Sequence, residues 1–105
     1  MVKHKNLVFI FSDQQRYDTM ACYGNDWIKT PNINSLSEES LIMERAYVAQ
    51  PVCTPARGTI TTGLHPHNAG PTVNTIPLPP EQKTIAEYLP SGYETAWFGK
   101  WHLGD

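Results

Sequence analysis

The chain has 105 residues, 17% of them charged, and a formal net charge of −2, which suits one small globular domain and argues against disorder. No long run of Lys or Arg is present, so non-specific binding to nucleic acid has little support. Two cysteines, Cys22 and Cys53, are too few for a disulfide framework, although one bridge between them would suit an exported protein. The apolar run 7–11 is too short for a signal peptide or a membrane span. The sequence therefore predicts a cytoplasmic protein without a membrane partner.

The first predicted element is a strand over residues 7–11. Its sequence, Leu-Val-Phe-Ile-Phe, is continuously apolar, which is typical of parallel strands with helices on both faces. Asp13 and Gln14 follow almost at once, and the carboxyl ends of such strands are where open α/β sheets bind ligands. Asp13 is a candidate functional residue, and capping of a turn or helix is an equally good interpretation.

A helix is predicted over residues 30–43. Thr30 can cap it and Pro31 suits its first turn. Ile33 and Leu36 lie on one helical face, so we assign this helix a scaffolding role. The stretch 43–48 is predicted to be a short strand.

The stretch 51–63 reads Pro-Val-Cys-Thr-Pro-Ala-Arg-Gly-Thr-Ile-Thr-Thr-Gly. Pro55 suits the first position of a helix, which would place Cys53 just before a helix N-terminus. Unpaired N–H groups and the helix dipole favour an anion there, and Arg57 adds a positive charge nearby. A reactive group aimed at an anionic substrate and a small buried cysteine on a turn remain equally good interpretations.

Two histidines, His65 and His67, follow this helix on either side of Pro66. Two histidines at this spacing could bracket a metal, but the proline fixes a turn between them and no third ligand lies nearby. We therefore interpret both as ordinary loop residues, and we expect a proline-rich loop over residues 74–80.

The last part of the chain predicts a helix and a strand. The helix spans residues 84–89 and has a capping-box pattern at its start. The strand spans residues 93–98 and is followed by Lys100 and His102. Taken alone, these two residues would be a surface lysine and a loop histidine.

Taken together, these motifs resemble those of the sulfatase family. The run Cys53-Thr54-Pro55-Ala56-Arg57, with a later Thr-Gly, resembles its Cys-x-Pro-x-Arg signature, although Thr61 stands where an apolar residue is usual. The run Gly99-Lys100-Trp101-His102 resembles its second signature, a strand ending in Gly-Lys-x-His, with Phe98 in place of a smaller residue. The resemblance covers nearly the whole chain but only the N-terminal portion of the family's catalytic domain. Residues 1–105 are therefore predicted to be an incomplete sulfatase domain.

The resemblance implies a fold and a reaction. The fold is α/β, the N-terminal part of an alkaline-phosphatase-like sandwich with a mostly parallel central sheet and flanking helices. The reaction is hydrolysis of sulfate monoesters by a formylglycine, which a maturation enzyme makes from Cys53 by reading Cys53-Thr54-Pro55-Ala56-Arg57. The hydrated aldehyde would supply the nucleophile, and its second hydroxyl would drive elimination of sulfate.

The resemblance also implies residue roles. Arg57 would hold the modified residue and the metal site in place. Lys100 would bridge the aldehyde hydrate and a sulfate oxygen, and His102 would assist elimination. A divalent cation, usually Ca²⁺, would be held by Asp13, Gln14 and the modified Cys53. A second Asp is common at position 14, and a Gln oxygen there can still ligate a hard cation with one negative charge fewer.

Three other functions remain open. The Asp13-Gln14 pair also occurs in related phosphonate and phosphodiester hydrolases, which share shape and metal requirements with sulfatases. A catalytically inactive fragment is the alternative from a different class, because the family draws further metal ligands and a second lysine from later segments. A thiol or redox function of Cys53 ranks lowest, since the sequence has no Cys-x-x-Cys. The sequence does not identify the sulfate ester.

Overall fold

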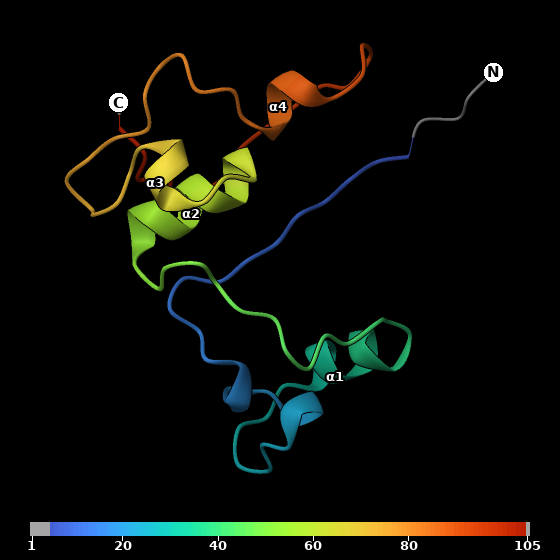
Figure 1. The fold of residues 1–105 in the computed structure, drawn as a ribbon. Helices are drawn as coiled ribbons and strands as arrows, with labels where there is room; N and C mark the ends of the chain where they lie inside the picture. Colours follow the sequence, from blue (N-terminus) through green and yellow to red (C-terminus); the bar gives the residue numbers. More distant parts are fainter. Residues whose placement is uncertain (1–4, 105) are drawn as a thin grey trace. The chain divides into compact units, whose positions relative to one another are not determined.

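A computed structural model describes residues 5–104 of the chain. The chain divides into two units, Met1–Ala46 and Tyr47–Asp105, and each has its own short helices (Figure 1). No strand forms between residues 5 and 104. No helix in that span is long and apolar enough to cross a bilayer.

The strand predicted over residues 7–11 does not form. The run is extended, and its first four side chains, Leu7, Val8, Phe9 and Ile10, are between 64% and 87% exposed. A strand satisfies its backbone N–H and C=O groups by pairing with neighbours, and a parallel strand is buried only when helices cover both faces. The described residues form no strand that could pair with it, so the apolar run is not part of a sheet.

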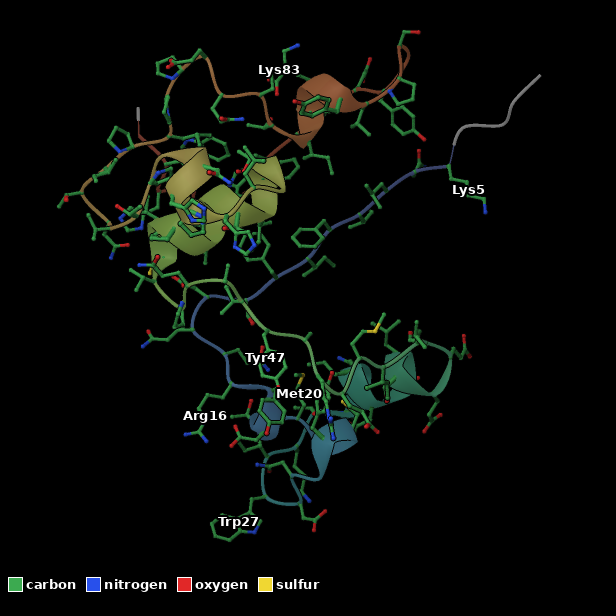
Figure 2. All side chains as sticks on the ribbon, viewed as in Figure 1. Lys5, Arg16, Met20, Trp27, Tyr47 and Lys83 are labelled. Atoms are coloured by element: carbon green, nitrogen blue, oxygen red, sulfur yellow. The ribbon has the colours of Figure 1, made fainter. Side chains whose placement is uncertain are left out.

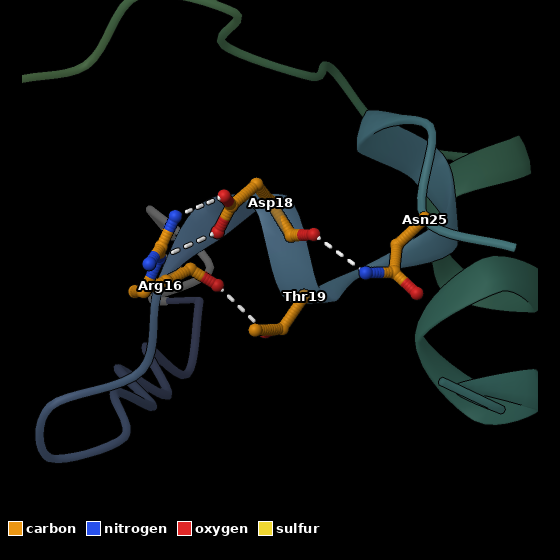
Figure 3. Close-up of polar contacts among 4 residues, drawn as sticks. All are labelled: Arg16, Asp18, Thr19 and Asn25. Carbon is orange, nitrogen blue, oxygen red and sulfur yellow. Dashed lines mark hydrogen bonds and ion pairs between the residues drawn. The ribbon is translucent and has the colours of Figure 1, made fainter. Parts of the chain in front are cut away.

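Two short 3₁₀ helices follow, η1 (Tyr17–Thr19) and η2 (Ala21–Tyr23). Side-chain contacts, drawn in Figure 3, add to the backbone hydrogen bonds that form these two turns. Arg16 forms an ion pair with Asp18, and the Thr19 hydroxyl donates to the Arg16 carbonyl at 2.6 Å. Asn25 Nδ2 donates to the Asp18 carbonyl at 2.8 Å, which closes the turn after η2.

Helix α1 spans Pro31–Glu38 and is shorter than predicted. The Ser37 hydroxyl donates to the Asn34 carbonyl at 2.7 Å, and the Ser40 hydroxyl donates to the Leu36 carbonyl at 2.6 Å. Such bonds from serine compete with the helical ladder, which explains why the helix ends before Met43. The predicted strand over 43–48 is also absent.

The N-terminus of α1 differs from the prediction as well. Thr30 occupies the N-cap position but makes no capping hydrogen bond. Its hydroxyl donates to Asn34 Oδ1 at 3.0 Å and accepts from the Ala21 N–H at 3.3 Å, so it ties α1 to η2 instead. Trp27, in the loop before α1, points away from the ribbon and is exposed (Figure 2).

Helix α2 spans Cys53–Thr62 and is central to the second unit. It begins two residues earlier than Pro55 predicted, and this is physically allowed because the first three helical N–H groups have no partner within the helix. It ends at Gly63, whose φ of +73° closes the last turn. Its buried residues are Thr54, Pro55, Arg57, Gly58 and Thr61.

Helix α3 (Pro66–Ala69) packs beside α2, and a loop leads from it to α4 (Ile85–Tyr88). The predicted proline-rich loop is confirmed, since residues 74–80 form neither helix nor strand. The predicted capping box at α4 is also confirmed: Thr84 accepts from the Ala86 N–H, and Glu87 accepts from the Thr84 N–H at 2.7 Å. Lys83 lies beside this helix (Figure 2), with its ammonium 6.0 Å from the centroid of the Tyr88 ring.

The chain then returns to α2. The strand predicted over residues 93–98 is wrong for the same reason as the first one, since no described strand pairs with it. The Trp97 and Trp101 rings instead meet edge to face, with centroids 4.9 Å apart. Leu103 is 2% exposed and forms a small core with Ala69, and its carbonyl accepts from the Leu78 N–H at 2.8 Å.

Candidate functional site

Cys53 is the first residue of α2, and its side chain is half-buried. The first turn of a helix carries N–H groups that have no partner within the helix, and it lies at the positive end of the helix dipole. The position therefore favours a negatively charged group, as predicted. Cys22, in the first unit, and Cys53 are both free thiols.

Arg57 connects the two sequence motifs of the second unit. It lies four residues after Cys53, which places both on one face of α2. The guanidinium is almost entirely buried, with Arg57 only 5% exposed, and it donates a hydrogen bond to the backbone carbonyl of Lys100. The same carbonyl accepts from Trp97 Nε1 at 3.3 Å. The start of α2 and the segment after residue 98 are thereby joined by a direct contact.

Lys100 and His102 are both exposed. His102 has a φ of +57°, a left-handed conformation that is uncommon outside glycine. The residue after it, Leu103, turns into the core. The backbone turn at His102 therefore leaves the imidazole at the surface while the next side chain, that of Leu103, is buried.

Asp13 and Gln14 belong to the first unit and are exposed. Gln14 has a φ of +61°, and among residues 5–104 only Gln14 and His102 combine a side chain with a positive φ. Such backbone conformations are found preferentially at functional sites. A hydrogen bond from Ser12 Oγ to Gln15 Oε1 at 2.6 Å spans these two residues.

The chemistry of Asp13 and Gln14 fits a hard cation. A carboxylate and an amide oxygen are both Ca²⁺ ligands, and Ca²⁺ takes six to eight oxygens. Within the described part of the chain, no three His, Cys, Asp or Glu side chains lie together in a way that could hold a metal ion. These two residues are therefore a partial ligand set.

The histidine pair flanks the start of α3. The rings of His65 and His67 are nearly parallel, with centroids 5.8 Å apart, and both side chains are exposed. Pro66 between them is buried, and it fixes the spacing of the pair. The described residues place no carboxylate or thiol with them as a third ligand.

A shallow cleft of about 430 Å³ lies in the first unit. Its lining includes Asn25, Asp26, Lys29 and Asn34, with apolar contributions from Ala21 and Ile28. None of the six predicted site residues lines it. The cleft is open, whereas most small-molecule sites enclose their ligand, so the motif residues remain the better candidates.

Two residues that contact the motifs were not predicted from the sequence. Asn74 Oδ1 accepts from the Thr54 N–H at 3.0 Å, and Trp97 donates to Lys100. A signal for Asn74 does exist: the residue before α2 is Val52, whose side chain cannot accept a hydrogen bond. A helix that starts on such a residue needs an acceptor from elsewhere.

Comparison with known proteins agrees with these motifs. The sulfatase family model matches residues 5–104. The uncharacterized sulfatase YidJ of Escherichia coli is 36% identical over 97% of this chain, and the ulvan-active sulfatase of Formosa agariphila is 38% identical over 93%. Human arylsulfatase A is 40% identical over 94%.

The matches cover only part of each relative. The chain spans 21%, 19% and 21% of the lengths of these three proteins, respectively. No solved structure matches it significantly. The family model nevertheless extends over almost every residue and includes both motifs, and the chain belongs to the sulfatase family.

Proposed function

We propose that this chain carries the nucleophile-bearing part of a sulfuric ester hydrolase. The observation that carries the proposal is the hydrogen bond from the buried Arg57 guanidinium to the Lys100 carbonyl. It brings together two motifs that are 43 residues apart in sequence. One motif places Cys53 at a helix N-terminus, and the other supplies a lysine and a histidine.

These groups suit a sulfate monoester. The substrate is an anion, and an enzyme needs positive charge around its oxygens, a nucleophile in line with the leaving group, and a proton for the departing alcohol. The N-terminus of α2 would attract the anion. Lys100 would bind a sulfate oxygen as a point charge, and His102 can give or accept a proton near neutral pH.

The nucleophile in this proposal comes from Cys53. A maturation enzyme would recognise Cys53-Thr54-Pro55-Ala56-Arg57 and convert the cysteine to formylglycine, whose hydrate supplies an oxygen nucleophile. The half-buried position at the start of α2 would hold that group in one orientation. Arg57, on the same face of the helix, would keep it aligned with Lys100.

Asp13 and Gln14 would hold a divalent cation such as Ca²⁺, together with the modified residue 53 and ligands from elsewhere in the protein. When bound, the cation lowers the pKa of a coordinated hydroxyl and orients a substrate oxygen. Asp13 supplies the one full negative charge of the pair, and Gln14 supplies a neutral oxygen.

The proposal includes the α/β sandwich implied by the family. In that fold the extended runs 7–11 and 93–98 would pair with strands supplied by other parts of the domain. The exposure of Leu7, Val8 and Phe98 is consistent with surfaces that require such partners.

An aryl sulfate assay tests the proposed activity. The protein as its cell makes it should release sulfate, and Cys53→Ala should abolish turnover while leaving thermal unfolding unchanged. Cys22→Ser is the matched control, since Cys22 lies in the first unit, and it should retain full activity. Turnover that survives Cys53→Ala would disprove the nucleophile assignment.

A second candidate function is hydrolysis of phosphonate or phosphodiester bonds. The observation that favours it is Gln14, which gives the cation site one negative charge fewer than a pair of carboxylates would. Parallel assays with matched aryl sulfate and aryl phosphonate esters separate the two reactions. A higher kcat/KM for the phosphonate ester would replace the sulfatase assignment with this one.

A further inference from the structure

Helix α2 begins without a cap of its own. Val52 occupies the N-cap position and makes no side-chain hydrogen bond. Pro55 has no N–H, so the donors that need partners in the first turn belong to Cys53 and Thr54. Thr54 is only 1% exposed, which leaves little water for its backbone. A buried N–H without an acceptor would be unfavourable.

Asn74 supplies the missing acceptor from 20 residues away. Its Oδ1 accepts from the Thr54 N–H at 3.0 Å, and its backbone carbonyl accepts from the Thr54 hydroxyl at 3.5 Å. A third bond ties the same loop to the segment before the helix: Gln50 Nε2 donates to the Thr72 carbonyl at 2.7 Å. The loop over residues 72–74 therefore holds the chain on both sides of Cys53.

We propose that Asn74 is a positioning residue for position 53, acting as an N-cap for α2 supplied from outside the helix. It fixes the first turn through Thr54 and thereby sets the direction in which the residue 53 side chain projects. Asn74 is itself exposed, so it adds little buried surface. Its effect on the structure is therefore confined to the first turn of α2. The catalytic part of this inference rests on the proposed function, whereas the capping part does not.

Asn74→Ala, Asn74→Asp and Asn68→Ala test the proposal. The alanine variant removes the acceptor. The aspartate variant keeps an acceptor oxygen and adds a negative charge that suits a helix N-terminus. Asn68 is an exposed asparagine on α3, and its alanine variant is the matched control.

The first measurement is amide hydrogen exchange on this chain, followed by NMR. In Asn74→Ala the Thr54 amide should exchange about fivefold faster, in line with the loss of a cap. The Thr61 amide, near the other end of α2, should keep its protection. Asn74→Asp and Asn68→Ala should match the unmodified chain. Unchanged exchange at Thr54, or equal loss of protection at Thr54 and Thr61, would overturn the proposal.

The second measurement is steady-state sulfate release by the protein as its cell makes it. Asn74→Ala should lower kcat on the order of tenfold with less than about a twofold change in KM, and Asn74→Asp should restore it. An aspartate variant as slow as the alanine variant would overturn the positioning role. If the unmodified protein hydrolyses no sulfate ester, the proposed function fails, and the exchange measurement alone decides whether Asn74 caps α2.

Discussion

The buried guanidinium of Arg57 donates to the backbone carbonyl of Lys100, and this bond joins the two motifs of the second unit. Arginine is suited to this position because its planar group stays charged and is less strongly hydrated than an ammonium. The carbonyl is also held by Trp97. The backbone at Lys100 is therefore fixed from two sides, while its side chain remains at the surface.

Replacement of Arg57 by lysine should weaken the second unit. A lysine ammonium is a compact, strongly hydrated charge and does not reproduce the planar donor group, and the Lys100 carbonyl would lose the donor that the buried Arg57 provides. We expect the free energy of unfolding to fall by about 1–3 kcal/mol, as measured by urea denaturation. Arg45→Lys, at an exposed arginine of the first unit, is the control. If both variants lowered the free energy of unfolding by the same small amount, the hydrogen bond from Arg57 would not stabilise the second unit.

Replacement of Gly58 by alanine should destabilise the packing of α2. A Cβ at this position would lie 2.8 Å from Pro71 Cγ and 4.0 Å from Leu103 Cδ2. Alanine favours the helix by about 1 kcal/mol over glycine, but overpacking typically costs about 1–3 kcal/mol. We expect a net loss of stability in thermal unfolding.

The double variant Gly58→Ala with Pro71→Ala identifies the cause. Removal of the proline ring relieves the overlap, so the double variant should be more stable than the sum of the two single effects predicts. If the effects of the two substitutions on stability simply add, the loss of stability in Gly58→Ala has a cause other than contact with Pro71.

Acid should weaken the capping box of α4. The hydrogen bonds that Glu87 accepts from Thr84 hold the pKa of its carboxyl below the usual value. Because the folded-state pKa is the lower one, this contribution is fully present above the pKa of the unfolded chain, about 4.3. It is lost as the pH falls through the folded-state value.

Carbon-detected NMR titration of the carboxyl groups measures this effect. Glu87 should titrate below the usual value for a glutamate. Thr84→Ala removes the hydroxyl donor and should move the Glu87 pKa towards the usual value. Identical titration of Glu87 in both proteins would contradict the assigned cause.

The sequence predicted local features better than those that depend on partners. The α4 capping box was predicted correctly because both residues that form it lie within four positions. The strands over 7–11 and 93–98 were predicted from apolar runs, but a strand exists only through pairing with another segment. The end of α1 was missed because serine side chains compete locally with the helical ladder.

In the candidate site, too, local features were predicted from the sequence and contacts between distant residues were not. Motif spacing singled out Cys53 and Arg57 and placed Cys53 near a helix N-terminus, whereas Lys100 and His102 became candidates only through the family resemblance. Motif spacing did not predict that the Arg57 side chain contacts the backbone of Lys100, since only the folded chain brings these residues together. Asn74 was missed because it is 20 residues from the turn that it caps.

The pair Asp13 and Gln14 should control cation affinity. Hard cations bind more tightly as the number of carboxylates in their site rises. Asp13→Asn removes the only full charge of the pair and should weaken Ca²⁺ binding at least about tenfold. Gln14→Asp should strengthen it, and aspartate tolerates the left-handed backbone that Gln14 adopts with φ at +61°.

Isothermal titration with Ca²⁺, on the protein as its cell makes it, measures both effects. Glu39→Gln, at an exposed carboxylate just after α1, is the control for general loss of negative charge and should leave the affinity unchanged. A tighter site in Gln14→Asp, together with a weaker one in Asp13→Asn, would assign both residues as ligands. If Asp13→Asn and Glu39→Gln lowered the affinity equally, the cation would bind elsewhere, and Asp13 would be left with the turn-capping role that its sequence position also allows.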